Sequence, residues 1–468
     1  MRKRSLKGQA LITAGSGALV RALGFGLRLW LSRRLGAEAL GIMELASGAH
    51  QLALTPAAAG LPGAMSHLTA RAGDERSRRL ALMAGRRLAL FTGAVISPLF
   101  LLLSPEIARL LVDERTLPSL LLFSPCALLV GLSSAYDGWF FGQGRALPPA
   151  LSEGAEQLVR IFAVLGLSFL LPRATAAWRA ALPALASTLG EAAGLAVVLA
   201  LAGRMGRDGS ASPGARHKAS PPPAAGRWMP PGGEASRRKN GGERAAARAL
   251  QRRMVRLALP LMLNRGCHAG LRAISSVILP LRLMAGGLDR AEALSRLGML
   301  QGMVLPMTLL PGLFSGAIAA VGGPAMARCR THRAENRLAG RMLGASLSIG
   351  LLCAGGLYAL SPWIARRIYR LPELSPLLRS ACPLAVVLPV QQAAGGMMTG
   401  LGMQKKTLLS SLLGAGATLL CTWRWAAWPG RGIYGAAYAS LAGHGLTLFC
   451  CLAQLFCRET KGKKSGAA

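Results

Sequence analysis

Two pairs of arginines stand inside long apolar stretches of the chain. Arg21 and Arg28 lie seven residues apart, and Arg265 and Arg272 repeat that spacing. Because seven residues are close to two helical turns, each pair presents two stacked cations on one helix face. An arginine at the centre of a membrane helix costs roughly 2.5–3.5 kcal/mol on insertion scales, so it is expected to face a cavity or a partner. The alternative, snorkelling to the membrane surface, suits Arg28 and Arg272 but not the two deeper arginines. The four residues therefore predict a cationic central cavity.

Other polar residues in the apolar stretches are few. Glu153, Glu156 and Arg160 follow one another at spacings of three and four, which predicts an ion pair between Glu156 and Arg160 within one helix. We prefer this structural role to substrate contact. The remaining polar residues of these stretches include Glu44, His50, Asp137, Glu191 and Asn264. Because the apolar stretches of the second half contain no carboxylate, a cation-binding pocket in that half is unsupported.

The elements that must carry these residues are membrane-spanning helices. Hydrophobic residues make up 52% of the 468 positions, and many occur in runs of about 20 residues, the length of helix that crosses a bilayer. The runs show little of the alternation typical of barrel strands. The predicted fold class is therefore an all-α polytopic membrane protein of two six-helix bundles. The twelve expected helices lie near 9–32, 40–68, 83–103, 118–142, 149–171, 180–203, 253–283, 296–320, 341–362, 378–402, 405–427 and 432–457.

A basic segment divides the chain into halves. Residues 204–252 are rich in Pro, Gly, Ser and Arg, which predicts a disordered cytoplasmic linker, with a clamp for anionic lipids as the alternative. The linker separates a bundle at 1–203 from a bundle at 253–457, and 458–468 form a tail.

The two halves also resemble each other. RALGFGLR at 21–28 matches RGCHAGLR at 265–272, and FGQGR at 141–145 occupies the same place in its half as TGLGM at 399–403. An even number of helices per half predicts a parallel repeat, with the substrate site at the repeat interface.

The net charge of +36 does not indicate nucleic acid. Most of the 55 basic residues fall in the terminal tails, the central segment and the even-numbered loops. This distribution predicts a multi-pass cell-membrane protein with both termini in the cytoplasm. The nine cysteines form no metal or disulfide pattern. We find no phosphate-binding loop, no zinc-protease motif and no nucleophile–base pair, so the sequence predicts neither an enzyme nor a metal or cofactor.

Several stretches resemble a known family. Residues 18–71 are similar to the opening of polysaccharide flippases of the stage V sporulation protein B type. That family belongs to the multidrug/oligosaccharidyl-lipid/polysaccharide exporter superfamily, which also holds the lipid II flippase. GWFFGQGRALPPALSEGAEQLVRI at Gly138–Ile161 resembles the family's junction of the fourth and fifth helices, and residues 395–420 and 432–440 resemble its tenth-to-twelfth helix region. The chain departs from the family in having Asp137 where relatives often carry a basic residue, in its twelve rather than fourteen spans, and in its long linker.

The resemblance implies a flippase for lipid-linked oligosaccharides that acts by alternating access in cell-wall or spore-cortex synthesis. In this interpretation Arg21, Arg28, Arg265 and Arg272 hold the pyrophosphate of an undecaprenyl carrier, and the coupling ion stays open. One alternative is a cation-coupled multidrug exporter of the same superfamily, which needs carboxylates in its cavity. The other is a non-transporting membrane scaffold that recruits wall-synthesis enzymes.

Overall fold

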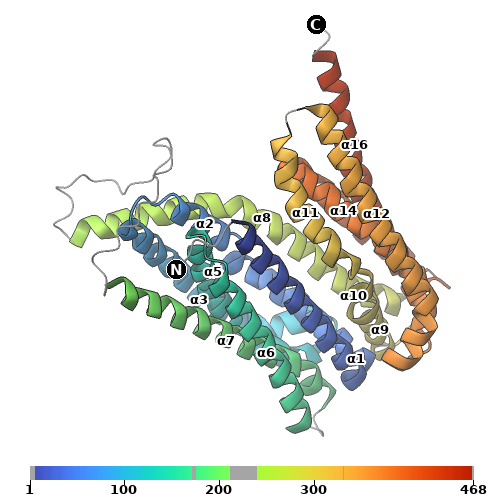
Figure 1. Ribbon diagram of the computed structural model, residues 1–468. Coiled ribbons are helices and arrows are strands. Elements are labelled where there is room, and N and C mark those ends of the chain that lie inside the picture. The colour runs from blue at the N-terminus through green and yellow to red at the C-terminus, as the bar shows by residue number, and fades with distance from the viewer. Residues whose placement is uncertain (1–5, 171–174, 211–239, 330, 429, 466–468) are drawn as a thin grey trace. The chain divides into compact units, whose positions relative to one another are not determined.

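The computed structural model describes residues 6–170, 175–210, 240–329, 331–428 and 430–465 (Figure 1). Within these ranges the chain is almost entirely helical and contains no β-strand, which confirms the all-α prediction. Each of the twelve predicted segments falls on a helix or on a run of consecutive helices. The first half contains α1 (Leu6–Ala58), α2 (Leu61–Ala70), α3 (Glu75–Leu110), η1 (Glu114–Thr116), α4 (Leu117–Phe123), α5 (Cys126–Gly142), α6 (Leu147–Leu170) and α7 (Ala176–Ser210). The second half contains α8 (Asn240–Ala285), α9 (Arg290–Leu297), η3 (Gly298–Val304), α10 (Leu305–Thr308), α11 (Pro311–Arg328), α12 (His332–Trp363), η4 (Ile364–Tyr369), α13 (Leu374–Ala381), α14 (Leu384–Gly400), α15 (Gln404–Trp425) and α16 (Gly432–Ser465).

Several of these helices have the length and the surface of membrane spans. Six helical segments of the described chain are long and apolar enough to cross a bilayer. Large apolar side chains on their surfaces are strongly exposed, among them Phe91, Leu102 and Leu352 at 69%, 75% and 79%. Such side chains are stable where lipid, rather than water, surrounds them. The chain is therefore a multi-pass membrane protein, and the full count of twelve spans stays a prediction.

α1 consists of two helices joined at a kink. Gly36 has φ 81 and ψ 169, a backbone conformation that interrupts the helix and suits glycine. The kink separates the first two predicted spans. The second span breaks again after α1, where Gly60 caps α2 at its N-terminus.

The internal repeat is visible in the backbone. Val112 and Arg370, which lie 258 positions apart, both have positive φ, at 74 and 56. Gly144 and Gly402, separated by the same offset, have φ 69 and 74. The helices between these sites also correspond, because α5 and α14 are each 17 residues long and each follows a capping proline. These features support the duplication that the short sequence matches predicted.

The chain packs into two compact units that cut across the sequence halves. Unit 1 comprises Met1–Gly24 and Ala49–Ala269, and unit 2 comprises Phe25–Gly48 and Gly270–Ala468. Both α1 and α8 are therefore shared: the middle of α1 belongs to unit 2 and its two ends to unit 1, whereas α8 divides once, after Ala269.

The predicted linker was too long at both ends. α7 continues to Ser210 and α8 begins at Asn240, so residues 204–210 and 240–252 are helical, and 211–239 lie outside the described residues. The physical reason is local. Residues 244–252 are all Ala, Arg, Leu or Gln, which favour helix, and Leu250 is buried.

Each unit has its own apolar core. In unit 1 the core joins α2, α3, α5, α7 and the first part of α8. Its fully buried members include Met65, Phe140 and Met254. In unit 2, α11, α12, α14 and α16 pack together around a core rich in methionine (Figure 1). The core of unit 1 thus includes α5 and α8, which carry Asp137 and Arg265 of the predicted site.

Candidate functional site

The four predicted arginines lie on α1 and α8 and divide evenly between the units. Arg21 and Arg265 belong to unit 1, whereas Arg28 and Arg272 belong to unit 2. Each unit thus contains one arginine from each helix. Arg21, Arg265 and Arg272 are exposed in the middle of long helices. Arg21 and Arg265 are accessible to an anionic ligand, and Arg272 has partners within the protein.

Arg28 is held by contacts within unit 2. Its Nη2 atom forms an ion pair with Glu44, which lies beyond the Gly36 kink on the same helix. The same Nη2 donates to the carbonyl oxygen of Gln301 at 3.1 Å, and Nε donates to that of Gly302 at 3.0 Å. Both carbonyls belong to η3, which is a π-helix. Arg28 therefore ties the α1 kink to η3, and its predicted contact with substrate stays a prediction.

Further polar residues join this cluster in unit 2. The charge of Arg272 acts on the carboxylate of Glu44 and on the imidazole of His444. His444 Nδ1 lies 3.0 Å from Gln391 Oε1, so these two side chains share a hydrogen bond. We did not predict Gln391 and His444 from the sequence. The signal that was available is the Gln391–Gln392 pair inside an otherwise apolar helix.

Unit 1 contains the predicted ion pair on α6. Arg160 Nη2 contacts Glu156 and also lies 3.7 Å from Glu191 Oε1 on α7. The side chains of the three residues are only 20–27% exposed. One guanidinium between two carboxylates joins α6 to α7, so the predicted Glu156–Arg160 ion pair is present, and its purely structural role stays a prediction.

More carboxylates surround that pair. The charges of Glu153 and Glu156 both act on Asp137 of α5, and the charge of Arg21 acts on Glu153. Asp137 Oδ1 and Arg160 Nε are buried, and neither finds a hydrogen-bond partner among the described residues. Glu156 and Glu191 thus contact Arg160, whereas Asp137 and the exposed Glu153 lie within electrostatic range of Glu156, and Arg21 lies within that range of Glu153.

The other predicted polar residues are less informative. His50 stacks on Phe123 with the ring centroids 3.9 Å apart and the planes 11° from parallel, an arrangement typical of packing. Asn264 lies on α8, but its side chain is outside the described residues. Within the described ranges, no set of three or more His, Cys, Asp or Glu side chains is arranged to hold a metal ion.

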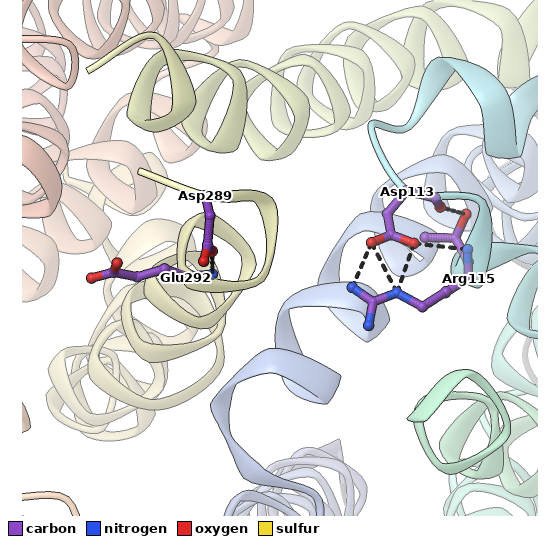
Figure 2. Close-up of polar contacts among 5 residues, drawn as sticks. Asp113, Arg115, Asp289 and Glu292 are labelled. Carbon is purple, nitrogen blue, oxygen red and sulfur yellow. Dashed lines mark hydrogen bonds and ion pairs between the residues drawn. The ribbon is translucent and has the colours of Figure 1, made fainter. Parts of the chain in front are cut away.

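Acidic residues at the helix ends have structural partners (Figure 2). Asp113 is buried and accepts hydrogen bonds from Arg115, at 3.0 Å from Nε and 2.7 Å from Nη2. It also accepts from the Arg115 backbone N–H at 2.8 Å. Asp289 caps α9 by accepting from the Glu292 backbone N–H at 2.7 Å. These contacts account for both aspartates without a ligand.

The arrangement resembles known proteins in sequence and in fold. The chain is 34% identical over 165 residues to stage V sporulation protein B of Bacillus subtilis (strain 168), a match that covers 34% of this chain and 32% of that protein. It is 27% identical over 183 residues to lipid II flippase MurJ of the same organism, covering 36% of this chain and 34% of the relative. The chain thus spans about a third of the length of the curated relatives it matches.

The fold similarity extends over nearly the whole chain. A multidrug resistance MATE family transporter of the MOP superfamily, in its inward-facing conformation, superimposes with a TM-score of 0.70 at 15% identity, covering 96% of this chain and 99% of the transporter. At that identity the similarity shows a shared fold alone. The family model described as "Polysaccharide biosynthesis protein" matches residues 6–330. Since this match covers more than half of the sequence, the chain belongs to the polysaccharide biosynthesis protein family and has the fold of a MOP-superfamily transporter.

Proposed function

We propose that the chain is a flippase that moves a lipid-linked oligosaccharide across the cell membrane by alternating access. The family's description and the names of both curated relatives support a substrate of this class. The observation that carries the proposal is the set of exposed arginines in the middle of α1 and α8. Inside a membrane, exposed guanidinium groups are stable when they meet an anion, and the linking pyrophosphate supplies one.

The arginines have different roles in this proposal. Arg21 and Arg265, both of unit 1, bind the pyrophosphate of an undecaprenyl carrier, because planar guanidinium groups donate two parallel hydrogen bonds to phosphate oxygens. Arg28, with its contacts to Glu44, Gln301 and Gly302, positions α1. The apolar carrier tail stays in lipid.

A cation-coupled multidrug exporter is the second candidate, because the carboxylate cluster of unit 1 outnumbers its arginines. However, Arg160 bridges two of those carboxylates, and the exposed charged residues at the middle of α1 and α8 are cationic. A cationic drug would be repelled there. Expression in a drug-sensitive strain separates the candidates, since a flippase leaves drug tolerance unchanged.

The direct test is binding of lipid II to purified protein, followed by native mass spectrometry. We expect the wild type to bind lipid II and the Arg21→Ala/Arg265→Ala variant to lose that binding, while Arg21→Lys/Arg265→Lys retains part of it. An Arg109→Ala/Arg179→Ala variant removes the same charge from exposed sites outside α1 and α8 and should bind normally. Equal binding by wild type and the Arg21→Ala/Arg265→Ala variant would refute the cationic site.

A further inference from the structure

Arginines cluster in the N-terminal half of α3 and in the N-terminal half of α8, both in unit 1. We call the six residues Arg79, Arg86, Arg87, Arg252, Arg253 and Arg256 the basic surface; all six are exposed. Arg79 lies 3.7 Å from Glu75, and the other five have no carboxylate partner in the described part of the chain. So many unpaired cations on two helices repel one another unless an anion neutralises them.

Packing within unit 1 holds these two helix segments together. Leu250 and Met254 of α8 are fully buried in the same core as Ala81 and Ala84 of α3. Gln251 Nε2 also donates to the carbonyl oxygen of Ala84 at 3.3 Å. The buried residues fix one face of α8 against the core, so the arginines between them point away from it. The basic surface is thus a fixed feature of unit 1.

The same outward face of α8 changes from basic to apolar along its length. Arg252 and Arg256 are each followed seven residues later, on nearly the same face, by exposed Leu259 and Leu263, at 47% and 61%. On α3, Arg86 and Arg87 are each followed four residues later by exposed Leu90 and Phe91, at 42% and 69%. The sequence of cations and then exposed apolar side chains on both helices matches the order of headgroup and acyl chain in a lipid monolayer.

We propose that the basic surface binds the phosphate headgroup of an anionic phospholipid, whose acyl chains lie against the exposed apolar side chains of α3 and α8. Charge complementarity selects an anionic over a zwitterionic headgroup. The apolar rows select a lipid over a soluble anion of equal charge. This proposal does not depend on transport of an oligosaccharide, because it concerns other residues of unit 1 and a different ligand.

The test uses the purified full-length chain without lipid II, titrated with phosphatidylglycerol or phosphatidylcholine and observed by native mass spectrometry. A basic residue near an anionic membrane surface contributes about 1 kcal/mol. Removing three should therefore weaken binding on the order of 100-fold, since each tenfold change in affinity corresponds to about 1.4 kcal/mol. We expect the affinity of the Arg252→Gln/Arg253→Gln/Arg256→Gln variant for phosphatidylglycerol to fall to this extent. The corresponding triple Lys variant should retain most of the wild-type affinity.

A matched variant, Arg109→Gln/Arg179→Gln/Arg431→Gln, removes the same charge elsewhere and should bind phosphatidylglycerol as the wild type does. Circular dichroism and size-exclusion chromatography establish that each variant is folded. If the α8 triple variant misfolds, Arg86→Gln/Arg87→Gln on α3 provides the same test, and its affinity for phosphatidylglycerol should fall about tenfold or more.

Three results would overturn the proposal. The first is unchanged phosphatidylglycerol binding in the folded variants, and the second is equal binding of phosphatidylcholine by the wild type. The third is binding of a soluble acidic peptide as tightly as phosphatidylglycerol, which would identify the surface as a protein-docking site.

Discussion

The contact between Arg28 and Glu44 makes a quantitative prediction about unit 2. The two side chains are 34% and 16% exposed, and Arg28 also donates to two carbonyl oxygens of η3. Breaking a fully buried ion pair costs about 3–5 kcal/mol, whereas an exposed pair contributes about 0–1 kcal/mol. Because Arg28 is about a third exposed and keeps its carbonyl acceptors, we expect Glu44→Gln to lower the free energy of unfolding by about 2 kcal/mol.

A double-mutant cycle isolates the pair itself. Arg28→Met, Glu44→Gln and the combined variant are compared by denaturant unfolding in detergent, at low and high salt. We expect a coupling energy of at least about 1 kcal/mol, because contacting charged residues are not additive. The exposed pair of Arg109 and Glu106, whose Nη1 and Oε1 lie 2.8 Å apart, is the control and should show coupling near zero. If the Arg28–Glu44 coupling is as small as that of the control, the pair does not stabilise unit 2 and our assignment of Arg28 as a positioning residue is wrong.

Two further predictions concern helix ends and helix crossings. Asp74 accepts a hydrogen bond from Ser77 N–H at 2.9 Å, and this contact lowers the pKa of the Asp74 carboxyl. Asp74→Ala should therefore cost about 1 kcal/mol at pH 7 in chemical unfolding. Because the folded pKa lies below the unfolded one, that difference is complete above about pH 4 and disappears as the pH falls through the folded pKa. Gly298→Ala would place a methyl group against the backbone of Ala37. Such overpacking destabilises a protein by about 1–3 kcal/mol, so the melting temperature should fall. Gly26→Ala places its methyl group in open space and should leave the melting temperature unchanged. Equal melting temperatures for the two glycine variants would contradict the close crossing.

The features that could be predicted from the sequence are those with local causes. Apolar runs about 20 residues long determine where helices form, and every predicted span is helical. The pairing of Glu156 with Arg160 follows from their spacing on one helix. The ends of the linker were predicted incorrectly, because its average composition concealed a helix-forming stretch with one buried leucine.

Contacts between distant segments were not predictable from one sequence. Arg28 donates to carbonyl oxygens more than 270 positions away, and no local pattern indicates a π-helical acceptor. The sharing of α1 and α8 between the units is equally non-local, since it depends on which core each helix segment packs against. Sequence reasoning therefore finds the charged residues but not which of them are neutralised by protein partners.

The duplicated units show why the fold alone does not assign a substrate. In unit 1, α6 and α7 cross where Gly190 faces the backbone of Glu156, and Arg160 links the helices through charge. At the 258-residue offset, Gly414 and Thr418 stand in place of Glu156 and Arg160. There α15 and α16 cross with Gly443 against Gly414 and Thr418. The same backbone crossing thus holds a charged network in one unit and small residues in the other. This difference arose between two units of one chain. The interior residues of this chain can therefore also differ in chemistry from those of a multidrug transporter that shares its fold at 15% identity. The substrate must therefore be argued from particular residues, and in our proposal those residues are the arginines of α1 and α8.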